Sequence, residues 1–203
     1  LACAFACNQF EFTQHLPLRS VRGQISYFPA TPETEKLSHA VNYAGYINPA
    51  RNGFHCVGAT FDPKMSTDQL RQEDHRWNYQ QLQASLPHLA NQLSTKKMNV
   101  PKGRVGFRCQ TPDYLPIVGP LPDPEYYRSQ YADLAKGFLK RQFPIGKSLP
   151  GLFISTGHGS RGITSTPFAA EIIAGYLTGE PRIIDREVLH SIHPARFLIR
   201  DIV

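Results

Sequence analysis

The residues best placed to do chemistry lie in one glycine-rich turn. Gly157, Gly159 and Gly162 have G-x-G-x-x-G spacing, and they follow a short apolar run at 152–155 that suits a buried strand. Glycines let the backbone approach a ligand closely, and the N-terminus of a following helix offers unpaired N–H groups and a partial positive charge. The pattern therefore predicts a cradle for an anion or a polar ligand, made of Gly157, His158, Gly159, Ser160, Arg161, Gly162, Ile163 and Thr164.

A dinucleotide site is one hypothesis for such a turn. It needs a further strand, an acidic residue about 20 residues on, and more βα units beyond. The segment 182–185 offers a short strand and Asp185, but only 18 residues, 186–203, follow it. A cradle for another part of a cofactor is therefore the favoured interpretation.

Arginines inside expected strands form a second set of candidates. Arg22 and Gln24 alternate with apolar residues in the predicted strand 16–30, and Arg108 lies in the alternating run 105–110. A strand arginine is commonly a surface charge, but it can also clamp a carboxylate with two parallel hydrogen bonds. Arg108 is the stronger clamp candidate because it leads into a Pro-Asp turn. Gly23 indicates either a close approach by a ligand or backbone, or a bulge.

Other kinds of site find little support. Among eight histidines only His190 and His193 form a close pair, and no cysteine lies at ligand spacing, so we expect no metal site. Ser155 and Ser160 lack the G-x-S-x-G elbow of a nucleophilic serine. The acidic residues lie mostly in expected turns or helix faces, and no acid–base pair stands out.

The elements that would position these residues alternate between strands and helices. Asn52-Gly53 predicts a hairpin turn within 43–60, and Ser66 to Gln69 have capping-box spacing ahead of a helix that ends at Pro87. Its expected apolar face is Leu70, Trp77, Leu82 and Leu86. A second short strand at 115–118 is closed by Gly119-Pro120. After the glycine turn, Pro167 is expected at the first helical position with Ser165 or Thr166 as its N-cap, and Gly179 as the stop.

Composition indicates a globular chain with room for acidic partners. Hydrophobic residues make up 41% and charged residues 19%, the net charge is +6, and no apolar run approaches membrane-spanning length. Four cysteines without disulfide-like density suggest reduced thiols in a cytoplasmic protein, with Cys3 and Cys7 in the core. Residues 1–7 suggest a strand already in progress, and hence a fragment of a longer protein.

The segment 123–150 is the most basic part of the chain. Tyr127, Tyr131, Leu134 and Phe138 have helical spacing. Between 128 and 147, one acid, Asp133, accompanies five basic residues, namely Arg128, Lys136, Lys140, Arg141 and Lys147. Basic and aromatic residues together can bind nucleic acid, but a solvated basic helix face explains the same pattern.

Four segments then occur in one order: Val21-Arg-Gly-Gln24, residues 106–119, residues 157–164 and His193-Pro-Ala-Arg196. Together they resemble the C-terminal part of the flavin-dependent amine oxidases of the D-amino-acid oxidase and glycine oxidase superfamily. More closely, they resemble the oxidoreductase half of bifunctional enzymes that modify the wobble uridine of tRNA. The resemblance covers nearly all 203 residues.

The resemblance implies a mixed α/β fold that is the C-terminal fragment of a two-domain FAD enzyme. Residues 1–22 would end the FAD-binding domain, 23–114 would form a substrate domain with an antiparallel-rich sheet, and 115–203 would return to the FAD domain, with 123–150 as an excursion. The upstream half of the polypeptide, with the ADP-binding glycines and a methyltransferase that uses S-adenosylmethionine, would be a partner outside this chain. We expect the 203 residues alone to bind FAD poorly.

The implied reaction is FAD-dependent oxidation of a secondary amine, which removes the carboxymethyl group of 5-carboxymethylaminomethyl-(2-thio)uridine in tRNA. Arg108 matches the family's substrate-carboxylate arginine, and Tyr46 is a weaker match in the substrate pocket. Residues 157–164, with Arg22, Gly23 and Gln24, match segments near the flavin ring. A small-amine oxidase of the glycine or sarcosine oxidase type, or a non-catalytic RNA-binding module, is the alternative.

Overall fold

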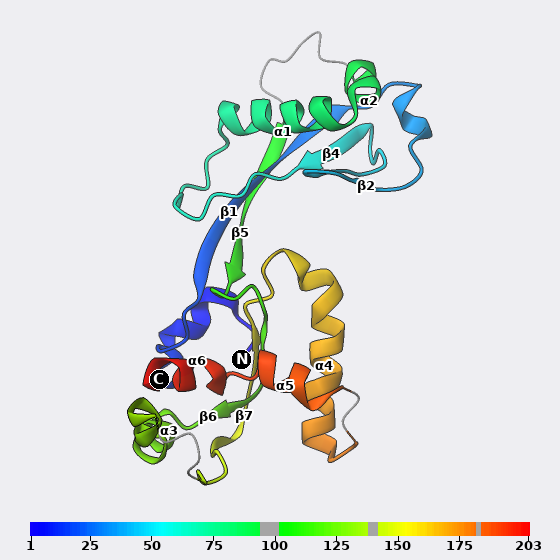
Figure 1. The fold of residues 1–203 in the computed structure, drawn as a ribbon. Helices are drawn as coiled ribbons and strands as arrows, with labels where there is room; N and C mark the ends of the chain where they lie inside the picture. The colour runs from blue at the N-terminus through cyan, green and yellow to red at the C-terminus, as the bar shows by residue number, and fades with distance from the viewer. Residues whose placement is uncertain (94–101, 138–141, 182–183) are drawn as a thin grey trace. The chain divides into compact units, whose positions relative to one another are not determined.

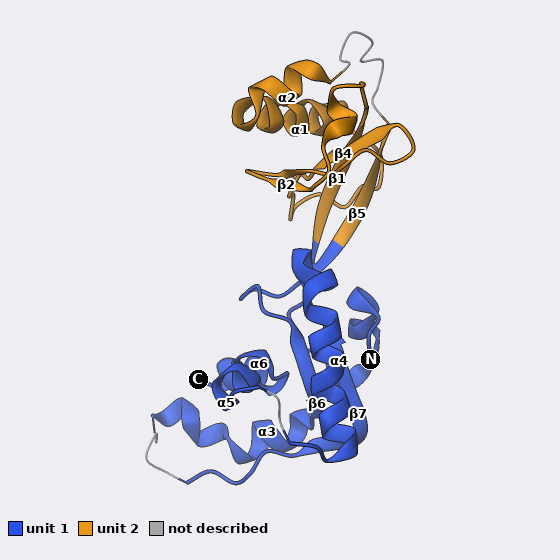
Figure 2. Cartoon of the chain, turned by 90° about the vertical axis from the view of Figure 1, so that its right-hand side faces the viewer, with its two compact units in different colours: residues 1–20, 108–203 blue, residues 21–107 orange. Residues whose placement is uncertain are grey.

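The computed structural model describes residues 1–93, 102–137, 142–181 and 184–203 (Figure 1). The chain divides into two compact units: unit 1 is residues 1–20 with 108–203, and unit 2 is residues 21–107 (Figure 2). The fold is mixed α/β, as the sequence predicts. The domain boundaries expected from the sequence, after residues 22 and 114, lie further along the chain than the boundaries of the units, after residues 20 and 107.

Unit 2 is built on a five-stranded sheet. Its strands run in the order β2 (Val41–Asn42), β3 (Tyr46–Ile47), β4 (Phe54–Gly58), β1 (Arg19–Pro29) and β5 (Lys102–Gln110). The pairs β2–β3, β3–β4 and β1–β4 are antiparallel. The predicted hairpin is confirmed: Arg51 and Phe54 exchange both backbone hydrogen bonds around Asn52 and Gly53, whose φ angles of 52° and 77° suit a type I′ turn.

Two helices, α1 (Gln72–Ser85) and α2 (Pro87–Gln92), accompany this sheet. The apolar core between them and the strands contains Phe28, Ile47, Val57, Leu82, Ala90 and Leu93. The predicted capping box is wrong, because α1 begins only at Gln72 and has no side-chain cap. Thr67 Oγ1 instead accepts the backbone N–H of Gln69, which holds the preceding segment in a local turn.

The expected apolar face of α1 is only half confirmed. Leu82 is buried and Leu86 packs against the core, but Trp77 is 39% exposed, and Leu70, which precedes the helix, is 45% exposed. The buried residues of α1 are His75, Asn78 and Leu82. Leu82 belongs to the apolar core, whereas His75 and Asn78 face the polar row of β1. His75 Nδ1 lies 2.8 Å from Ser26 Oγ, and the Asn78 amide donates to Ser26 Oγ and Gln24 O, so the helix rather than solvent covers this row.

Unit 1 has a two-stranded antiparallel sheet, β6 (Ile117–Pro122) with β7 (Ser148–Thr156), in which Ile117 pairs with Thr156 and Gly119 with Ile154. Its helices are α3 (Pro124–Gln130), α4 (Gly162–Thr178), α5 (Arg186–Ile192) and α6 (Ala195–Ile202). The strand predicted at 115–118 was expected to end at Gly119-Pro120, and this end is wrong. β6 continues through Pro120 to Pro122, which is possible because an edge strand can leave a proline nitrogen without a partner.

The N-terminal residues form a strand contact only at Leu1. Leu1 N donates to Phe153 O at 2.6 Å and Ser155 N donates to Leu1 O at 2.9 Å, but Ala4–Gln9 is a 3₁₀ helix rather than the predicted strand. Cys7 is in the core as predicted, whereas Cys3 is exposed. All four cysteines are free thiols. The core of this part joins Cys7, Leu16, Ile117, Leu121, Ile154 and Phe197.

The excursion at 123–150 contains two short helical segments rather than one long helix, because α3 is followed by a separate 3₁₀ helix at Ala132–Lys136. Rings of Tyr127, Tyr131 and Phe143 stack with centroids 5.0 and 5.6 Å apart. Phe138, Lys140 and Arg141 lie outside the described residues. Among those described, the cations Arg128, Lys136 and Lys147 are matched by the carboxylates Asp123, Glu125 and Asp133. No helix in the described ranges has the length and apolar character needed to cross a bilayer.

Candidate functional site: a glycine turn before an uncapped helix

The glycine turn of unit 1 connects β7 to α4. β7 ends at Thr156, Gly157 and Gly159 have φ angles of +72° and +57°, and a 3₁₀ turn over Gly159–Arg161 runs into α4. Positive φ favours glycine, because a Cβ would crowd the backbone there. The strand–turn–helix order predicted from the spacing is therefore confirmed.

The predicted start of the helix at Pro167 is wrong. α4 begins at Gly162, and Pro167 lies in its second turn. Hydroxyl groups stabilise the early start: Thr164 and Ser165 each donate to Arg161 O at 2.9 Å, and Thr166 donates to Gly162 O at 2.7 Å. A proline this close to the N-terminus removes only one helical hydrogen bond.

The N-terminus of α4 has free hydrogen-bonding capacity. Arg161 occupies the N-cap position, and no side chain caps the helix. The backbone N–H groups of the first turn have no partner inside an α-helix, and the helix dipole adds partial positive charge at this end. Ile163, in that first turn, is 95% exposed. The turn and helix end together can therefore receive the electron-rich edge of a ligand.

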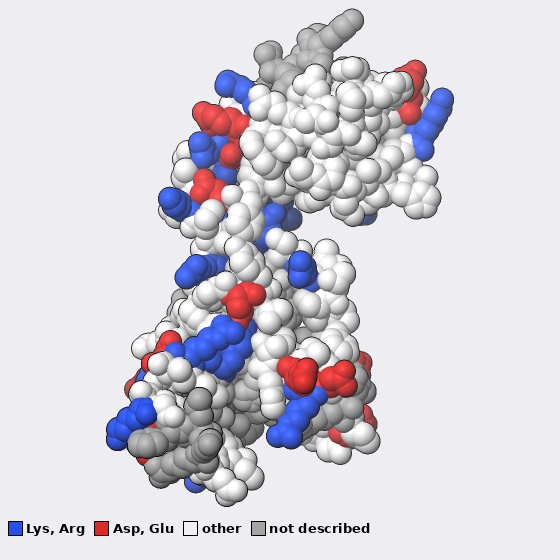
Figure 3. All heavy atoms as spheres, in the orientation of Figure 1, with Lys and Arg blue, Asp and Glu red and all other residues white. Residues whose placement is uncertain are grey.

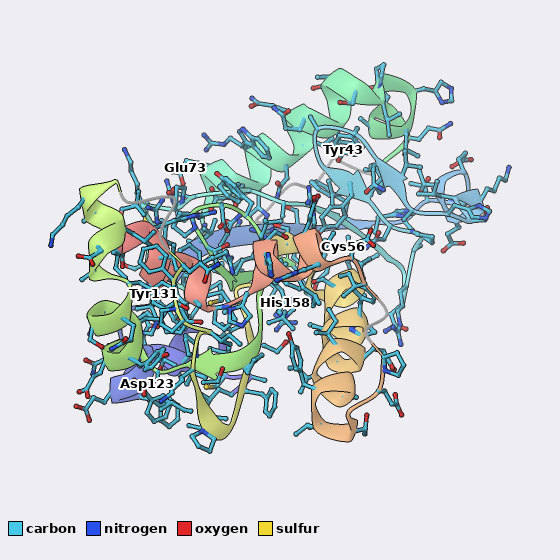
Figure 4. All side chains as sticks on the ribbon, turned by 60° about the horizontal axis from the view of Figure 1, so that its bottom comes forward. Tyr43, Cys56, Glu73, Asp123, Tyr131 and His158 are labelled. Carbon is cyan, nitrogen blue, oxygen red and sulfur yellow. The ribbon has the colours of Figure 1, made fainter. Side chains whose placement is uncertain are left out.

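The side chain of His158 forms hydrogen bonds to both elements that flank the turn, β7 and α4 (Figure 4). Its Nδ1 lies 2.8 Å from Ser165 Oγ, and its Nε2 lies 3.0 Å from Ser155 Oγ. Because the Ser165 hydroxyl already donates to Arg161 O, it must accept the N–H of Nδ1, and Nε2 must accept from Ser155. Burial lowers the pKa of His158. The neutral ring thus joins the end of β7 to the first turn of α4.

Close packing holds the turn against the segment that follows β5. A Cβ at Gly157 would lie 2.8 Å from Thr111 Cγ2, too close for any side chain without movement. Gln110 forms a bridge with His158, and its side chain lies 3.6 Å from the position of a Cβ at Gly159. The geometry of residues 157–159 is therefore set by both its own φ angles and this neighbour.

Arg196 holds the segment 111–115 in place, a role that its position in the His193-Pro-Ala-Arg196 motif does not indicate. Its guanidinium binds both carboxylate oxygens of Asp113 at 2.9 and 3.1 Å and the carbonyl of Leu115 at 2.9 Å. Burial alone would raise the pKa of Asp113, but the hydrogen bonds and charge of Arg196 hold that pKa well below its usual range. The alternation of a strand cannot signal this pair, because 83 residues separate its members.

Arg22 and Gln24 are in unit 2 and are fully buried. Arg22 donates to Asp74 Oδ2 at 2.6 Å, Thr67 O at 2.8 Å, Gln69 O at 2.7 Å and Gln24 Oε1 at 3.0 Å. The Gln24 amide donates to Arg71 O and accepts from Arg71 N. These two side chains connect β1 to the segment before α1. Gly23, which lies between them, has no side chain and makes no such connection.

The two substrate-site candidates are on different units. Arg108 lies half-buried on β5 within unit 1, two residues before Gln110, and Tyr46 lies half-buried on β3 within unit 2. Tyr46 pairs with Gly58, and its carbonyl accepts a hydrogen bond from the Tyr43 hydroxyl at 3.3 Å. Asp185 is not the end of a strand, as a dinucleotide site would need, but directly precedes α5. Within the described ranges no three or more His, Cys, Asp or Glu residues gather as a metal-binding group.

The sequence of the chain is similar to that of known FAD-dependent proteins. Residues 2–176 match a family model described as FAD dependent oxidoreductase. The chain is 40% and 38% identical, over its whole length, to the tRNA 5-methylaminomethyl-2-thiouridine biosynthesis bifunctional proteins MnmC of Chromobacterium violaceum and Stutzerimonas stutzeri. It spans about 31% of the length of each.

Solved structures with the same fold include oxidases of small amines. Iminodiacetate oxidase from a Chelativorans species superposes with a TM-score of 0.65 at 23% identity, over 94% of this chain and 44% of that one. Glycine oxidase from Geobacillus kaustophilus gives a TM-score of 0.62 at 21% identity, over 89% of this chain and 40% of that one.

Proposed function

Because the chain belongs to the family of FAD-dependent oxidoreductases, we propose that it is the flavin-ring and substrate part of an enzyme that oxidises a secondary amine on tRNA. The proposed substrate is 5-carboxymethylaminomethyl-(2-thio)uridine at the wobble position, from which the carboxymethyl group is removed. The names of the MnmC relatives support a role in modifying this nucleotide. The chain covers about 31% of those relatives, so the activity is that of a longer protein.

The proposed chemistry breaks the C–H bond of the carboxymethyl carbon next to the amine nitrogen. FAD supplies the redox chemistry by accepting the hydride, and the protein supplies orientation and electrostatics. The resulting C=N bond is hydrolysed by water to glyoxylate and the primary amine of aminomethyl-uridine. The methyl transfer that would follow, which uses S-adenosylmethionine, is assigned to a part of the protein outside these 203 residues.

The observation that carries the proposal is the uncapped N-terminus of α4 behind the glycine turn. Residues 157–164 are proposed to face the pyrimidine side of the flavin ring, where negative charge develops on reduction. Backbone N–H groups and the positive end of a helix stabilise such charge. Gly157 and Gly159 keep Cβ atoms out of the approach, and the neutral His158 holds the turn in place.

The other candidates receive distinct roles in the proposal. Arg108 binds the substrate carboxylate and thereby aims the C–H bond at the flavin, because a bidentate clamp fixes both position and direction. Tyr46 lines the substrate pocket. The backbone at Gly23 lies near the flavin, while Arg22 and Gln24 act as positioning residues that hold β1, since their side chains are engaged with residues 67–74.

The test uses the full-length protein that carries this chain. We expect a flavin absorbance spectrum, and release of glyoxylate from tRNA that bears the carboxymethylaminomethyl group. Arg108→Ala should lose most of this activity, at least about a hundredfold, while its flavin content stays unchanged. Arg108→Lys keeps the charge but not the two-pronged geometry, so it should recover only part of the rate.

Three results would contradict the proposal in different ways. A colourless protein that cannot be reconstituted with FAD removes any oxidase role and leaves a non-catalytic RNA-binding module. Turnover of free glycine or sarcosine without turnover of tRNA points to a small-amine oxidase, whose substrates also carry a carboxylate for Arg108. Unchanged kinetics in Arg108→Ala would rule out the role of Arg108 as the carboxylate clamp and leave the rest of the proposal in place.

A further inference from the structure

One face of the unit 2 sheet carries cations and aromatic rings. The five strands of this sheet contain no Asp or Glu residue. A Cβ at Gly103 would lie 2.7 Å from His75 Cε1, so this position of β5 points toward α1. Side chains alternate along a strand, and the exposed Lys102 and Arg104 therefore point to the opposite face. We call the set of Tyr27, Arg51, Phe54, Cys56, Lys102 and Arg104 the outer face.

Most of the outer face lines a single hollow. The cavity has a volume of about 440 Å³, and its walls include Tyr27, Arg51, Phe54, Cys56 and Lys102. Tyr27 and Cys56 are direct partners across β1 and β4. The Lys102 ammonium lies 5.8 Å from the centroid of the Phe54 ring. Flat aromatic rings and cationic groups thus line one concave surface.

The cations of the outer face have no acidic partners. Among the described residues, neither Arg51, Lys102 nor Arg104 forms an ion pair, whereas Arg22 on the covered face is paired with Asp74 at 2.6 Å. Unit 2 contains ten Lys and Arg residues against six Asp and Glu residues, so it carries +4 of the chain's net charge of +6. Its acids all lie outside the strands, in the segments 33–35, 62–68 and 73–74.

The surface around α1 and α2 differs from the outer face in its distribution of charge. In the view of Figure 3, acidic and basic side chains lie close together at two edges of unit 2. The covered side of the sheet and its helices therefore mix both signs. The charged side chains of the outer face are all positive, and a surface of this kind favours the binding of a polyanion.

We propose that the outer face binds the RNA strand of the tRNA substrate. This inference rests on the proposed function and adds to it the surface that holds the nucleic acid. Lysine and arginine side chains bind phosphates, and exposed aromatic rings on a sheet stack unpaired bases. The hollow accommodates a base beside Tyr27 or Phe54, while Arg51, Lys102 and Arg104 contact the backbone. β5 continues from these cations to Arg108, the proposed substrate clamp.

The excursion at 123–150 fits the same ligand less well. Its described cations are matched in number by carboxylates, and Lys136 is bound to Asp133 at 3.1 Å. The outer face has no such competing acids. A protein surface that covered the outer face would also have to supply carboxylates for three desolvated cations, because unpaired buried charge is costly.

The test is binding of tRNA by the full-length protein, measured between about 50 and 200 mM salt. The variant is Lys102→Gln with Arg104→Gln, which removes two exposed charges. The matched control is Lys36→Gln with Arg76→Gln, two exposed cations of the same unit on η3 (Thr34–Lys36) and α1. Flavin absorbance and melting temperature confirm that each variant is folded.

We expect the outer-face variant to bind tRNA at least about tenfold more weakly and to lose about two units from its salt slope, one for each phosphate contact. The control should bind like the wild type. Equal affinity and slope in both variants overturns the inference, while binding by the wild type still supports the proposed function. No binding of tRNA by the wild type overturns both, and its flavin spectrum then shows whether an oxidase role survives. An unchanged tRNA affinity with an altered oligomeric state assigns the face to a second copy of the protein and overturns the inference.

Discussion

At the scale of single residues, Gly157 carries two independent constraints. Its φ of +72° favours glycine, and a Cβ there would overlap Thr111 Cγ2 at 2.8 Å. Gly151 has nearly the same φ, +71°, but nothing lies within 4 Å of its Cβ position. The two glycines therefore separate backbone strain from steric overlap.

We predict that Gly157→Ala weakens the site far more than Gly151→Ala. The backbone strain costs about 1–2 kcal/mol at either position, offset in part by the reduced freedom of the unfolded chain. Only Gly157→Ala must also displace Thr111, so it should melt earlier and bind FAD more weakly in the full-length protein. Thr111→Ser removes Cγ2, keeps the hydroxyl that donates to Leu115 O, and should restore FAD affinity to Gly157→Ala. Equal FAD affinity in the two alanine variants would contradict the steric argument.

The residue scale also shows what a sequence pattern can and cannot reveal about side chains. The glycine spacing located the turn because positive φ and close approach are local demands. The roles of Arg22 and Gln24 were not readable in the same way. A polar row on a strand looks alike whether it faces water or a buried network, and the partners of these two residues lie 45 to 52 residues away.

At the scale of elements, the C-terminal helix holds the turn that backs the glycine site. Arg196 of α6 is 8% exposed and binds Asp113 and Leu115, while Arg200, 55% exposed, binds the same carboxylate from the surface. Removing one partner of a buried pair leaves an uncompensated charge and typically costs about 3–5 kcal/mol. An exposed ion pair contributes about 1 kcal/mol or less.

We therefore predict that Arg196→Ala releases the segment 111–115 and Arg200→Ala does not. The measurement is hydrogen exchange of peptides covering 109–116 and 193–203 in the full-length protein. Exchange in both peptides should accelerate strongly in Arg196→Ala, and Arg196→Lys should rescue little because lysine cannot bind the carboxylate in two places. Similar exchange in Arg196→Ala and Arg200→Ala would show that the buried pair does not hold the turn.

Boundaries of elements were predictable where the signal was local. The Asn52-Gly53 turn, the end of β7 at Thr156 and the αL stop at Gly179 all follow from single residues and their spacing, whereas the start of β7 at Ser148 lies four residues before the predicted run. The start of α4 does not follow from such a local signal. Three consecutive hydroxyl residues bind carbonyls of the preceding turn, and the helix therefore begins before Pro167. The buried face of α1 was misread because its first half packs polar groups against polar groups.

At the scale of the whole molecule, fully or partly buried histidines govern the response to acid. Desolvation by burial is the largest cause of a lowered pKa at His15, His75, His158 and His193. At His193 burial, with the nearby His190 and Arg196, lowers the pKa from 6.5 to about 4. A lowered pKa means that the unfolded state binds a proton more readily than the folded state. Stability is therefore lost as the pH falls from 6.5 toward 4, and the loss ends below the folded pKa.

The carboxylate of Asp113, which pairs with Arg196, affects stability in a lower pH range than the histidines do. The pKa of Asp113 is lowered in the folded protein, so its contribution is present above the usual value of 3.8 and is lost only as the pH falls below it. A loss of stability between pH 6.5 and 4 therefore comes from the histidines rather than from this ion pair. His193 is the best single probe of that range, because its shift corresponds to about 3 kcal/mol.

We predict that His193→Asn flattens the pH dependence around α6. The asparagine oxygen can still accept the Ala195 N–H that His193 Nδ1 accepts at 3.1 Å, but it takes up no proton in this range. Hydrogen exchange of peptides covering 189–203 should be similar in wild type and variant at pH 7.5, after correction for the intrinsic effect of pH. At pH 5 the wild type should be less protected than His193→Asn, since only the wild type gains a proton on local unfolding. Parallel curves for the two proteins from pH 7.5 to 5 would mean that His193 is not held neutral by the fold.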